Sequence, residues 1–532
     1  MTRHGLTVFR WSWTTFIVVL TSAPYLINWW STPDGYQFTW ILPPYPEDSF
    51  GYMAWAQQAA HGAWLFKIKY TALPHSAFLF NPFFLLCGWI SALLQLDIGV
   101  VFLVVKAVGA VLLLATFYRY TDYLRLNPTQ SVAAAILLGI SSGLGGILAV
   151  LGFASSPPTY PADLWMPEMS TFWSLLWNPL FPWSLTLMLL SIFWIDRGTA
   201  KERASDLWLS GLATGVMALV HPYSLPLLFT IAVIIAVVRV KTGALGYLFR
   251  YFAAAAPFVI YLIITSRTNA LVAKHSVMGE MKSPPIAGYL LGFGFPLLLF
   301  IVGVVTARGA LVKRHWQLIL WFSLSILFAY FPFWFQRKLV FGAHIPLSIL
   351  AGVALDLVFS KWSIGGARRV AGAVATVVLL PFLIATPTYL LITQYQKVKA
   401  NADGAYFVKN EIMDGLKILQ QRSRPDDVVF AALATSRLIP AFSGNTVVWG
   451  HWAMSIDLKE RQTWFMNVFN AQSDEKRSAE FWGNDIQFVF ADTEVKQWFE
   501  SHPFMAGLIL RDSHKVFENS SVVIYQRPGP SS

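Results

Sequence analysis

The sequence predicts a polytopic α-helical membrane protein, with about 11 to 13 transmembrane helices, that ends in a soluble α/β domain. Three observations support this fold class. The 532 residues are 56% hydrophobic and only 13% charged, whereas soluble domains carry about 25% charged residues. The mean hydropathy is +0.53. Apolar runs of roughly 20 residues, each long enough to cross a ~30 Å hydrocarbon core, recur as far as residue 391.

The apolar runs define candidate spans whose ends are known to about 2–4 residues. The first span follows Arg3 and His4 and has no small-residue cleavage site, so we expect an uncleaved first helix. The candidate spans are 9–29, 76–96, 98–118, 130–153, 181–195, 207–220, 223–240, 247–266, 287–307, 315–333, 342–360 and 369–391. We therefore divide the chain into a membrane domain, 1–391, and a C-terminal domain, 392–532.

The distribution of Lys and Arg predicts the orientation of the helices, because short basic loops stay in the cytoplasm. With these loops inside, the C-terminal domain faces outward. An outward C-terminus and an inward N-terminus require an odd number of crossings, but the candidate spans are even in number. Either one span does not cross or one crossing is missing, and we expect a re-entrant or interfacial segment in 49–96. The basic loops are 118–125, 196–203, 239–250, 307–314 and 360–369.

The net charge of +11 does not indicate a nucleic-acid partner. The basic residues form short clusters between apolar segments, and no long basic block or basic–aromatic groove is present. The expected partner is instead the lipid bilayer. The single cysteine, Cys87, excludes an intrachain disulfide and a cysteine-based metal site.

Four loops on the predicted outer side keep chemically capable side chains. Ionisable groups near a membrane are costly, and they are usually paired or functional. We therefore expect these loops to line one outward-facing cleft. The groups are Glu47 and Asp48 in ILPPYPEDSFGYM; Asp163 and Glu168 in YPADLWMPEMSTFW; His221 in LVHPYS; and Gln336, Arg337 and Lys338 in FWFQRKLVFG.

Each group also has a purely structural interpretation. Asp48 or Ser49 could cap a following amphipathic helix on the membrane surface. The two later carboxylates could be solvated loop residues, His221 before a proline could end a helix, and the basic pair could be an interfacial anchor. That pair, Arg337 and Lys338, lies on the side that the charge bias disfavours. A lipid phosphate would explain it, because Arg binds phosphate through two parallel hydrogen bonds and Lys binds it as a point charge.

The segment PEDSFGYMAWAQQAAHG (46–62) resembles the first outer loop of GT-C glycosyltransferases. This membrane-embedded class includes oligosaccharyltransferases, protein O-mannosyltransferases and aminoarabinose transferases, and it carries a carboxylate pair after the first helix. Glu168 in MPEM resembles the second acidic site of the class, with Asp163 as the other candidate, and Arg337 in FQRKLVFGAHIPL resembles a late arginine near the donor phosphate. The resemblance covers 1–391. The adjacent Glu-Asp pair and the absence of a WWD motif count against an asparagine-linked oligosaccharyltransferase.

The resemblance implies transfer of a sugar from a polyprenyl-phosphate- or polyprenyl-pyrophosphate-linked donor to a glycan, lipid or protein acceptor. The reaction would take place at the outer face of a bacterial or archaeal inner membrane. Asp48 is the first candidate for general base, and Glu47 could share that role. Glu168, Asp163 and His221 would position the acceptor or a metal. Arg337, Lys338 and Gln336 would bind the donor phosphate, and a divalent cation, Mg²⁺ or Mn²⁺, is the alternative charge.

The C-terminal domain alternates helical and extended patterns, which predicts a small α/β sandwich. EIMDGLKILQQ, KERQTWFMNVF and EVKQWFES favour helices, whereas DDVVFAAL, NTVVWG and DIQFVFAD favour strands. VFENSSVVIYQRP favours a hairpin. No phosphate-binding glycine motif or nucleophile elbow is present. His451, Trp449 and Trp452 are candidate acceptor contacts, although a structural role explains His451 equally well.

Two other functions fit the architecture less closely. A transporter or flippase of lipid-linked sugars would need charges deep within its spans and paired repeats, and the sequence shows few such charges and no repeat. A non-catalytic membrane scaffold would not explain the clustered carboxylates. Release of polyprenyl phosphate from a lipid-linked sugar would distinguish an enzyme from both.

Overall fold

The computed structural model describes residues 2–154, 160–240, 243–269, 271, 281–307, 309–362, 367–402, 404–456, 458–470, 480–483 and 485–528. The chain forms two compact units, and α1 (Arg3–Trp30), α4 (Ile98–Tyr123), α11 (Ala244–Thr268) and α17 (Ala367–Ala400) have residues in both. Unit 1 comprises Met1–Pro24, Leu103–Ile264 and Glu280–Gln396, and unit 2 comprises Tyr25–Phe102, Thr265–Gly279 and Lys397–Ser532.

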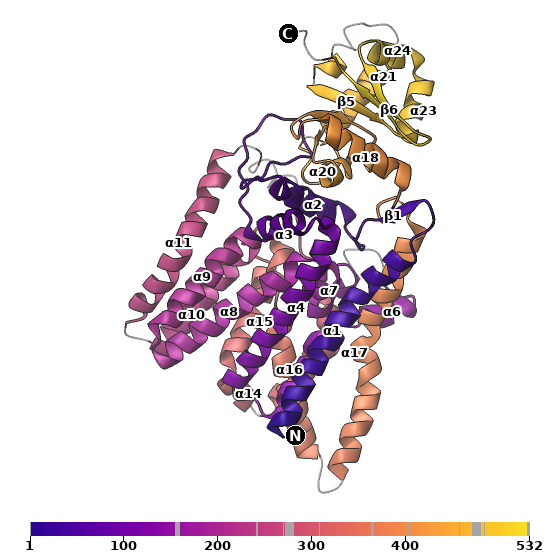
Figure 1. The fold of residues 1–532 in the computed structure, drawn as a ribbon. Helices are drawn as coiled ribbons and strands as arrows, with labels where there is room; N and C mark the ends of the chain where they lie inside the picture. Colours follow the sequence, from indigo (N-terminus) through magenta and orange to yellow (C-terminus); the bar gives the residue numbers. More distant parts are fainter. Residues whose placement is uncertain are drawn as a thin grey trace. The chain divides into compact units, whose positions relative to one another are not determined.

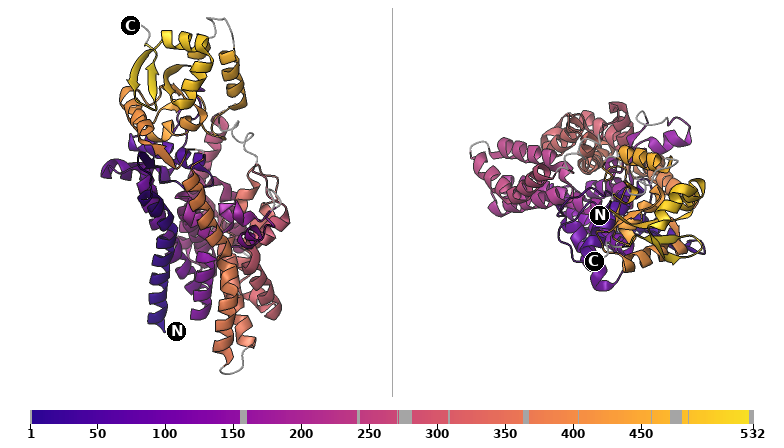
Figure 2. Two further views of the ribbon diagram at one scale, coloured as in Figure 1. Left: turned by 90° about the vertical axis from the view of Figure 1, so that its right-hand side faces the viewer. Right: turned by 90° about the horizontal axis from the view of Figure 1, so that it is seen from above.

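Unit 1 is a bundle of helices (Figure 1). Helix α8 packs against α9 and α10, and α16 packs against α5 and α13. The left view of Figure 2 shows the helices of this bundle again running in roughly one direction. Besides the shared helices, the elements are α5 (Pro128–Ile140), α6 (Gly145–Val150), α7 (Thr171–Trp177), α8 (Leu180–Lys201), α9 (Ala204–Val220), α10 (Leu225–Val240), α13 (Ile286–Thr306), α14 (Ala310–Arg314), α15 (Trp316–Phe328), α16 (His344–Trp362) and the short 3₁₀ turns η1 (Ala162–Leu164), η2 (Pro167–Met169), η3 (Pro222–Ser224) and η4 (Gln336–Val340).

Within the described residues, 6 helices are long and apolar enough to cross a membrane. The sequence predicts about 11 to 13, and part of the difference arises where predicted spans are broken. The predicted span 130–153 is interrupted after α5, because Ser141 is extended and Leu144 N–H donates to Leu291 O at 2.8 Å. Gly143 allows this approach, since a Cβ there would lie 2.2 Å from Leu291 O. The 6 helices are Ile98–Tyr123, Leu180–Lys201, Pro222–Val240, Ala244–Thr268, Ile286–Thr306 and Gln336–Ser360.

The interrupted region 49–96 forms two short helices of unit 2, α2 (Pro46–Ala60) and α3 (Pro82–Leu94). At 1.5 Å per residue, the 13 residues of α3 reach only about 20 Å, less than a ~30 Å hydrocarbon core. Helices α2 and α3 pack closely against each other, because a Cβ at Gly88 of α3 would lie 2.4 Å from Ala56 O of α2. These dimensions agree with the re-entrant or interfacial segment predicted for 49–96.

Unit 2 also contains a mixed 5-stranded sheet, drawn in orange and yellow in Figure 1. Its order is β4–β3–β5–β7–β6, with β3 parallel to β4 and β5, and β7 antiparallel to β5 and β6. The helices, strands and hairpin predicted for the C-terminal domain are confirmed at their expected places. The elements are α18 (Asn410–Arg422), β3 (Val428–Phe430), α19 (Leu433–Ser436), α20 (Ile439–Phe442), β4 (Thr446–Val447), α21 (Leu458–Asn470), β5 (Ile486–Ala491), α23 (Thr493–Ser501), α24 (Pro503–Arg511), β6 (His514–Glu518) and β7 (Val523–Gln526).

The first loop of the chain belongs to this C-terminal unit. Strand β1 (Tyr36–Phe38) pairs antiparallel with β2 (Phe407–Lys409), and α2 packs against α20. No local pattern in the sequence predicts this long-range pairing. The predicted domain boundary at residue 391 stays a prediction, and the compact units instead group 25–102 with the C-terminal residues.

Candidate functional site

The predicted carboxylate pair lies in the first turn of α2. The helix begins at Pro46 and its N-cap is Tyr45, so neither Glu47 nor Asp48 is the N-cap residue. One face of α2, including Phe50 and Met53, is buried. The helix is thus an integral part of unit 2, and the two carboxylates project from its well-packed first turns.

Asp48 faces two aromatic side chains that follow Gly450 in the chain. The indole Nε1–H of Trp452 donates to Asp48 Oδ1 at 3.0 Å. His451 Nε2 lies 3.6 Å from the same oxygen. The Asp48 side chain is 23% exposed, so the carboxylate is oriented by neighbours and still reachable.

The backbone fixes the orientation and the tautomer of His451. Its Nδ1 accepts hydrogen bonds from the N–H groups of Ala453, at 3.0 Å, and Met454, at 3.2 Å. The neutral ring therefore carries its proton on Nε2, the nitrogen that faces Asp48. Its ring is 2% exposed and packs on Tyr70, with 5.4 Å between the ring centroids. His451 can thus present either an N–H or, when protonated, a positive charge to this carboxylate.

Glu47 is paired with an arginine that the sequence analysis missed. Arg437 Nη1 lies 3.2 Å from Glu47 Oε1, and the arginine side chain is only 8% exposed. The hydroxyl of Tyr70 donates to Arg437 O at 3.1 Å, and burial, followed by the charge of Glu47, raises the Tyr70 pKa well above its usual value. Glu47 is therefore held by a buried cation, whereas Asp48 contacts Trp452 and His451. A single charge within the apolar stretch SRLIPAF is the signal that could have revealed Arg437.

The third aromatic candidate has a different environment. Trp449 is 3% exposed, belongs to the hydrophobic core of the sheet, and donates its Nε1–H to Ala431 O at 3.0 Å. Its position is that of a core residue, whereas Trp452 is 45% exposed. A sugar acceptor is therefore better sought at Trp452.

In unit 1, Glu168 meets the predicted basic pair. The Lys338 ammonium donates to the Glu168 carboxylate, whose side chain is 3% exposed. The guanidinium of Arg337 lies over the Trp165 ring, 5.4 Å from its centroid. Burial raises the pKa of Glu168, but the charges of Lys338 and Arg337 outweigh this effect and hold the pKa below its usual value. Glu168 is therefore ionised in the folded protein.

Gln336 and His221 support the same part of unit 1. Gln336 Oε1 accepts from Ser283 N–H at 3.4 Å. His221 is the C-cap of α9, and its ring packs on Phe341 with centroids 4.7 Å apart. Burial, together with the charge of Lys338, lowers the His221 pKa to about 3. A neutral, stacked ring at a helix end fits the structural interpretation of this histidine.

Asp163 accepts hydrogen bonds from the loop that follows α5. Its Oδ2 accepts from Gly143 N–H at 2.9 Å, Ser142 Oγ–H at 3.2 Å and Gly145 N–H at 3.4 Å. The side chain is fully buried, and burial raises its pKa to about 7 despite these hydrogen bonds. This environment suits a structural carboxyl group, which leaves Glu168 as the acidic member of the unit 1 cluster.

The candidate residues thus fall into two groups. Unit 2 brings together Glu47, Asp48, His451 and Trp452, and unit 1 brings together Glu168, Arg337 and Lys338. Among the described residues, no group of three His, Cys, Asp or Glu side chains could hold a metal ion. The predicted Mg²⁺ or Mn²⁺ therefore has no site assigned to it among the described residues.

No protein-family model matches the sequence, and no curated protein matches it significantly. Solved structures of other proteins share its fold, among them the following three. The Archaeoglobus fulgidus oligosaccharyltransferase AglB, in complex with an inhibitory peptide and a dolichol-phosphate, is 13% identical with a TM-score of 0.53 and is matched over 98% of this chain and 74% of that one. ArnT from Cupriavidus metallidurans, bound to undecaprenyl phosphate, is 12% identical with a TM-score of 0.51, over 98% and 99%. The mycobacterial arabinofuranosyltransferase AftD is 15% identical with a TM-score of 0.53, over 100% and 40%.

The chain therefore has the fold of the GT-C membrane glycosyltransferases. This confirms the predicted fold class, a multi-pass helical membrane protein with a small C-terminal sheet. At identities of 12% to 15% the likeness concerns the fold alone. The residues of the two groups acquire a function only through their own chemistry.

Proposed function

We propose that this protein is a glycosyltransferase that moves a sugar from a polyprenyl-phosphate-linked donor to an acceptor hydroxyl or amine. The reaction takes place at the outer face of the membrane that the protein spans. One observation carries the proposal. The largely buried cluster of Glu168, Arg337 and Lys338 contains two positive charges and one negative charge. Both cations lie at the beginning of the candidate span Gln336–Ser360, where a lipid phosphate would reside.

The cluster contains a hydrogen-bond donor that an anion could engage. Arg337 Nε–H is buried and has no hydrogen-bond acceptor among the described residues. Leaving such a group unsatisfied costs about 1–3 kcal/mol. A phosphate oxygen would accept this hydrogen bond and balance the remaining positive charge, and the guanidinium fork suits phosphate geometry. The dolichol-phosphate bound to AglB and the undecaprenyl phosphate bound to ArnT support a donor of the same class.

The transfer needs a base for the acceptor and positive charge for the leaving phosphate, and the unit 2 group offers the first and the unit 1 group the second. An acceptor oxygen or nitrogen attacks the anomeric carbon, and the bond from that carbon to the phosphate oxygen breaks. Asp48 takes the acceptor proton as general base. The bonding electrons leave with the phosphate, whose charge Arg337 and Lys338 stabilise. Trp452 and His451 orient the Asp48 carboxylate, and the acceptor would be a glycan, lipid or protein.

The proposed steps use charges that the chain itself supplies. Another structure of the Archaeoglobus fulgidus enzyme contains Zn and sulfate, and a divalent cation was an alternative from the sequence. Here Lys338 already neutralises Glu168. The mechanism therefore routes no step through a metal, and assays with and without a chelator compare the two alternatives.

The test uses the purified full chain in lipid nanodiscs with polyprenyl-phosphate-linked sugars, and it measures released polyprenyl phosphate. Arg337→Gln should weaken donor binding about 10- to 100-fold, because a charge-assisted hydrogen bond contributes about 1.5–3 kcal/mol. Arg511→Gln is the matched control, since Arg511 is exposed and pairs with its neighbour Asp512. Unchanged donor affinity in folded Arg337→Gln would reject the phosphate site. Movement of the donor across the bilayer without release would favour a flippase.

A further inference from the structure

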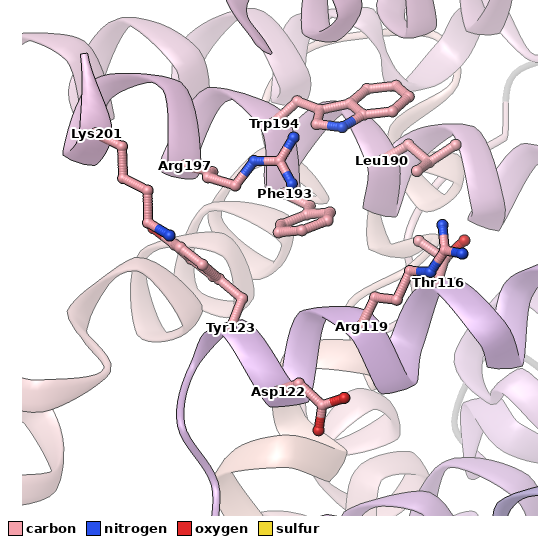
Figure 3. A pocket seen from close by; sticks show the side chains of 9 residues that line it. All are labelled: Thr116, Arg119, Asp122, Tyr123, Leu190, Phe193, Trp194, Arg197 and Lys201. Carbon is pink, nitrogen blue, oxygen red and sulfur yellow. The ribbon is translucent and has the colours of Figure 1, made fainter. Parts of the chain in front are cut away.

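A second basic site lies at the far end of unit 1 from Glu168 and Lys338. A pocket of about 460 Å³ opens between the last turns of α4 and α8. Figure 3 shows cationic and aromatic side chains entering it from both helices. The residues that matter here are Arg119 and Tyr123 from α4, and Phe193, Trp194, Arg197 and Lys201 from α8.

Helix α9 runs from this pocket to the proposed donor-phosphate cluster, so its length gives the distance between them. Asp206 in its first turn bonds the pocket residue Arg197, with both distances 2.7 Å. Its C-cap is His221, whose pKa is lowered partly by Lys338. The 17 residues of α9 extend about 25 Å. The pocket is therefore distinct from the proposed donor site.

The pocket carries positive charge that the protein does not neutralise. Three carboxylates in or beside the pocket are already engaged, Asp122 with Arg10, Asp206 with Arg197, and Asp196 with Arg239. Glu202, next to Lys201 in the chain, does not line the pocket. By contrast, Arg119 and Lys201 are exposed and form no ion pair within the described parts of the chain. Two positive charges thus remain available to a ligand.

Aromatic rings form the wall behind these charges. Arg197 lies over the buried Phe193 ring at 4.8 Å, and Lys201 lies over Tyr123 at 5.8 Å. Trp194 adds a half-buried indole. The positive-inside bias and the helix dipole explain basic residues at helix ends. Neither effect requires a concave pocket, and basic pockets between membrane helices bind anionic lipid head groups.

We propose that this pocket binds the head group of an anionic phospholipid. The phosphate would lie between Arg119 and Lys201, and the glycerol and upper acyl carbons would contact the aromatic wall. The lipid would come from the leaflet at the basic ends of α4 and α8, which the charge bias assigns to the cytoplasm. A negatively charged leaflet supplies this ligand at high local concentration.

The test measures lipid binding to the full chain by native mass spectrometry, with phosphatidylglycerol and phosphatidylcholine as probes. The wild-type protein should retain phosphatidylglycerol preferentially. Arg119→Gln with Lys201→Gln should weaken that binding about 10- to 30-fold, and each single variant about fivefold, the usual contribution of a basic residue near an anionic membrane surface. The matched control, Arg250→Gln with Lys313→Gln, removes two cations that do not line the pocket and should bind like wild type.

Three results would overturn the proposal. One is unchanged phosphatidylglycerol affinity in the double variant or in both single variants, provided that they unfold at the wild-type temperature in phosphatidylcholine nanodiscs. Another is an equal loss in the control, which would indicate a diffuse charge effect. The third is displacement of the lipid by inorganic phosphate at equal concentration, which would indicate a soluble anion as the natural ligand.

Discussion

The role of Asp48 can be tested by a substitution that preserves its shape. In Asp48→Asn the side-chain oxygen can still accept the Trp452 Nε1–H, which lies 3.0 Å from it in the wild type. The substitution removes the negative charge that faces His451 and abolishes the basicity of the group. Packing and the indole contact therefore remain, while the proposed catalytic property disappears.

The structure sets different magnitudes for stability and for catalysis. Asp48 lies in the first turn of α2 and is not its N-cap, so its contribution to the helix is a charge–dipole interaction of about 0.3–1 kcal/mol. The free energy of unfolding should therefore fall by no more than about 1 kcal/mol. A positioned general base contributes about 10²- to 10⁴-fold to the rate, and the transfer rate should fall by that factor.

The assay compares initial rates of polyprenyl phosphate release with thermal unfolding measured on the same preparations. Asp414→Asn is the matched control, because Asp414 is an exposed carboxylate of unit 2 on α18. Glu47→Gln should be measured in parallel, since adjacent carboxylates can exchange roles. This variant removes the carboxylate that pairs with the buried Arg437 and should lose more stability than Asp48→Asn.

Wild-type turnover in both Asp48→Asn and Glu47→Gln would refute the reasoning, and the carboxylates would then be structural. A parallel loss in Asp414→Asn would show that the assay reports general damage. A rate loss confined to Asp48→Asn, with little change in stability, is the expected result.

The remaining predictions concern the unit 1 cluster, a buried carboxyl group and the topology. Lys338→Met should lower the free energy of unfolding by about 3–5 kcal/mol, because it leaves the buried Glu168 without its main partner. Adding Glu168→Gln should recover most of this loss in thermal unfolding, and no recovery would show that the ion pair does not stabilise the fold. The pKa of Asp163 is raised to about 7, so its contribution to stability is complete below the unfolded value of about 3.9 and is lost as the pH rises through 7; Asp163→Asn should flatten the unfolding temperature between about pH 5 and 8, and an unaltered profile would contradict this assignment. Finally, Ser501→Cys, an exposed position of α23, should react with a membrane-impermeant maleimide in intact cells, since the one native cysteine, Cys87, is buried; labelling only after the inner membrane is permeabilised would reverse the predicted orientation.

Local patterns in the sequence determined the fold class and most elements of the C-terminal domain. Apolar runs of membrane length and strand-like or helix-like periodicity depend only on neighbouring residues. For this reason DIQFVFAD could be identified as β5 and EVKQWFES as α23 without knowledge of their partners. Costly charges near the membrane likewise marked Glu168, Arg337 and Lys338 before any contact was known.

Tertiary structure alone decided which of these groups meet. Glu47 and Arg437 are 390 residues apart, Asp48 and Trp452 are 404 apart, and Glu168 and Lys338 are 170 apart. No local periodicity specifies such pairs, because they form only when distant segments pack, as β1 does with β2. Long-range pairing also placed the first loop in the C-terminal unit and neutralised Glu47. The sequence identified the two carboxylates, and the packing of distant segments decided that Glu47 meets Arg437 and that Asp48 meets Trp452 and His451.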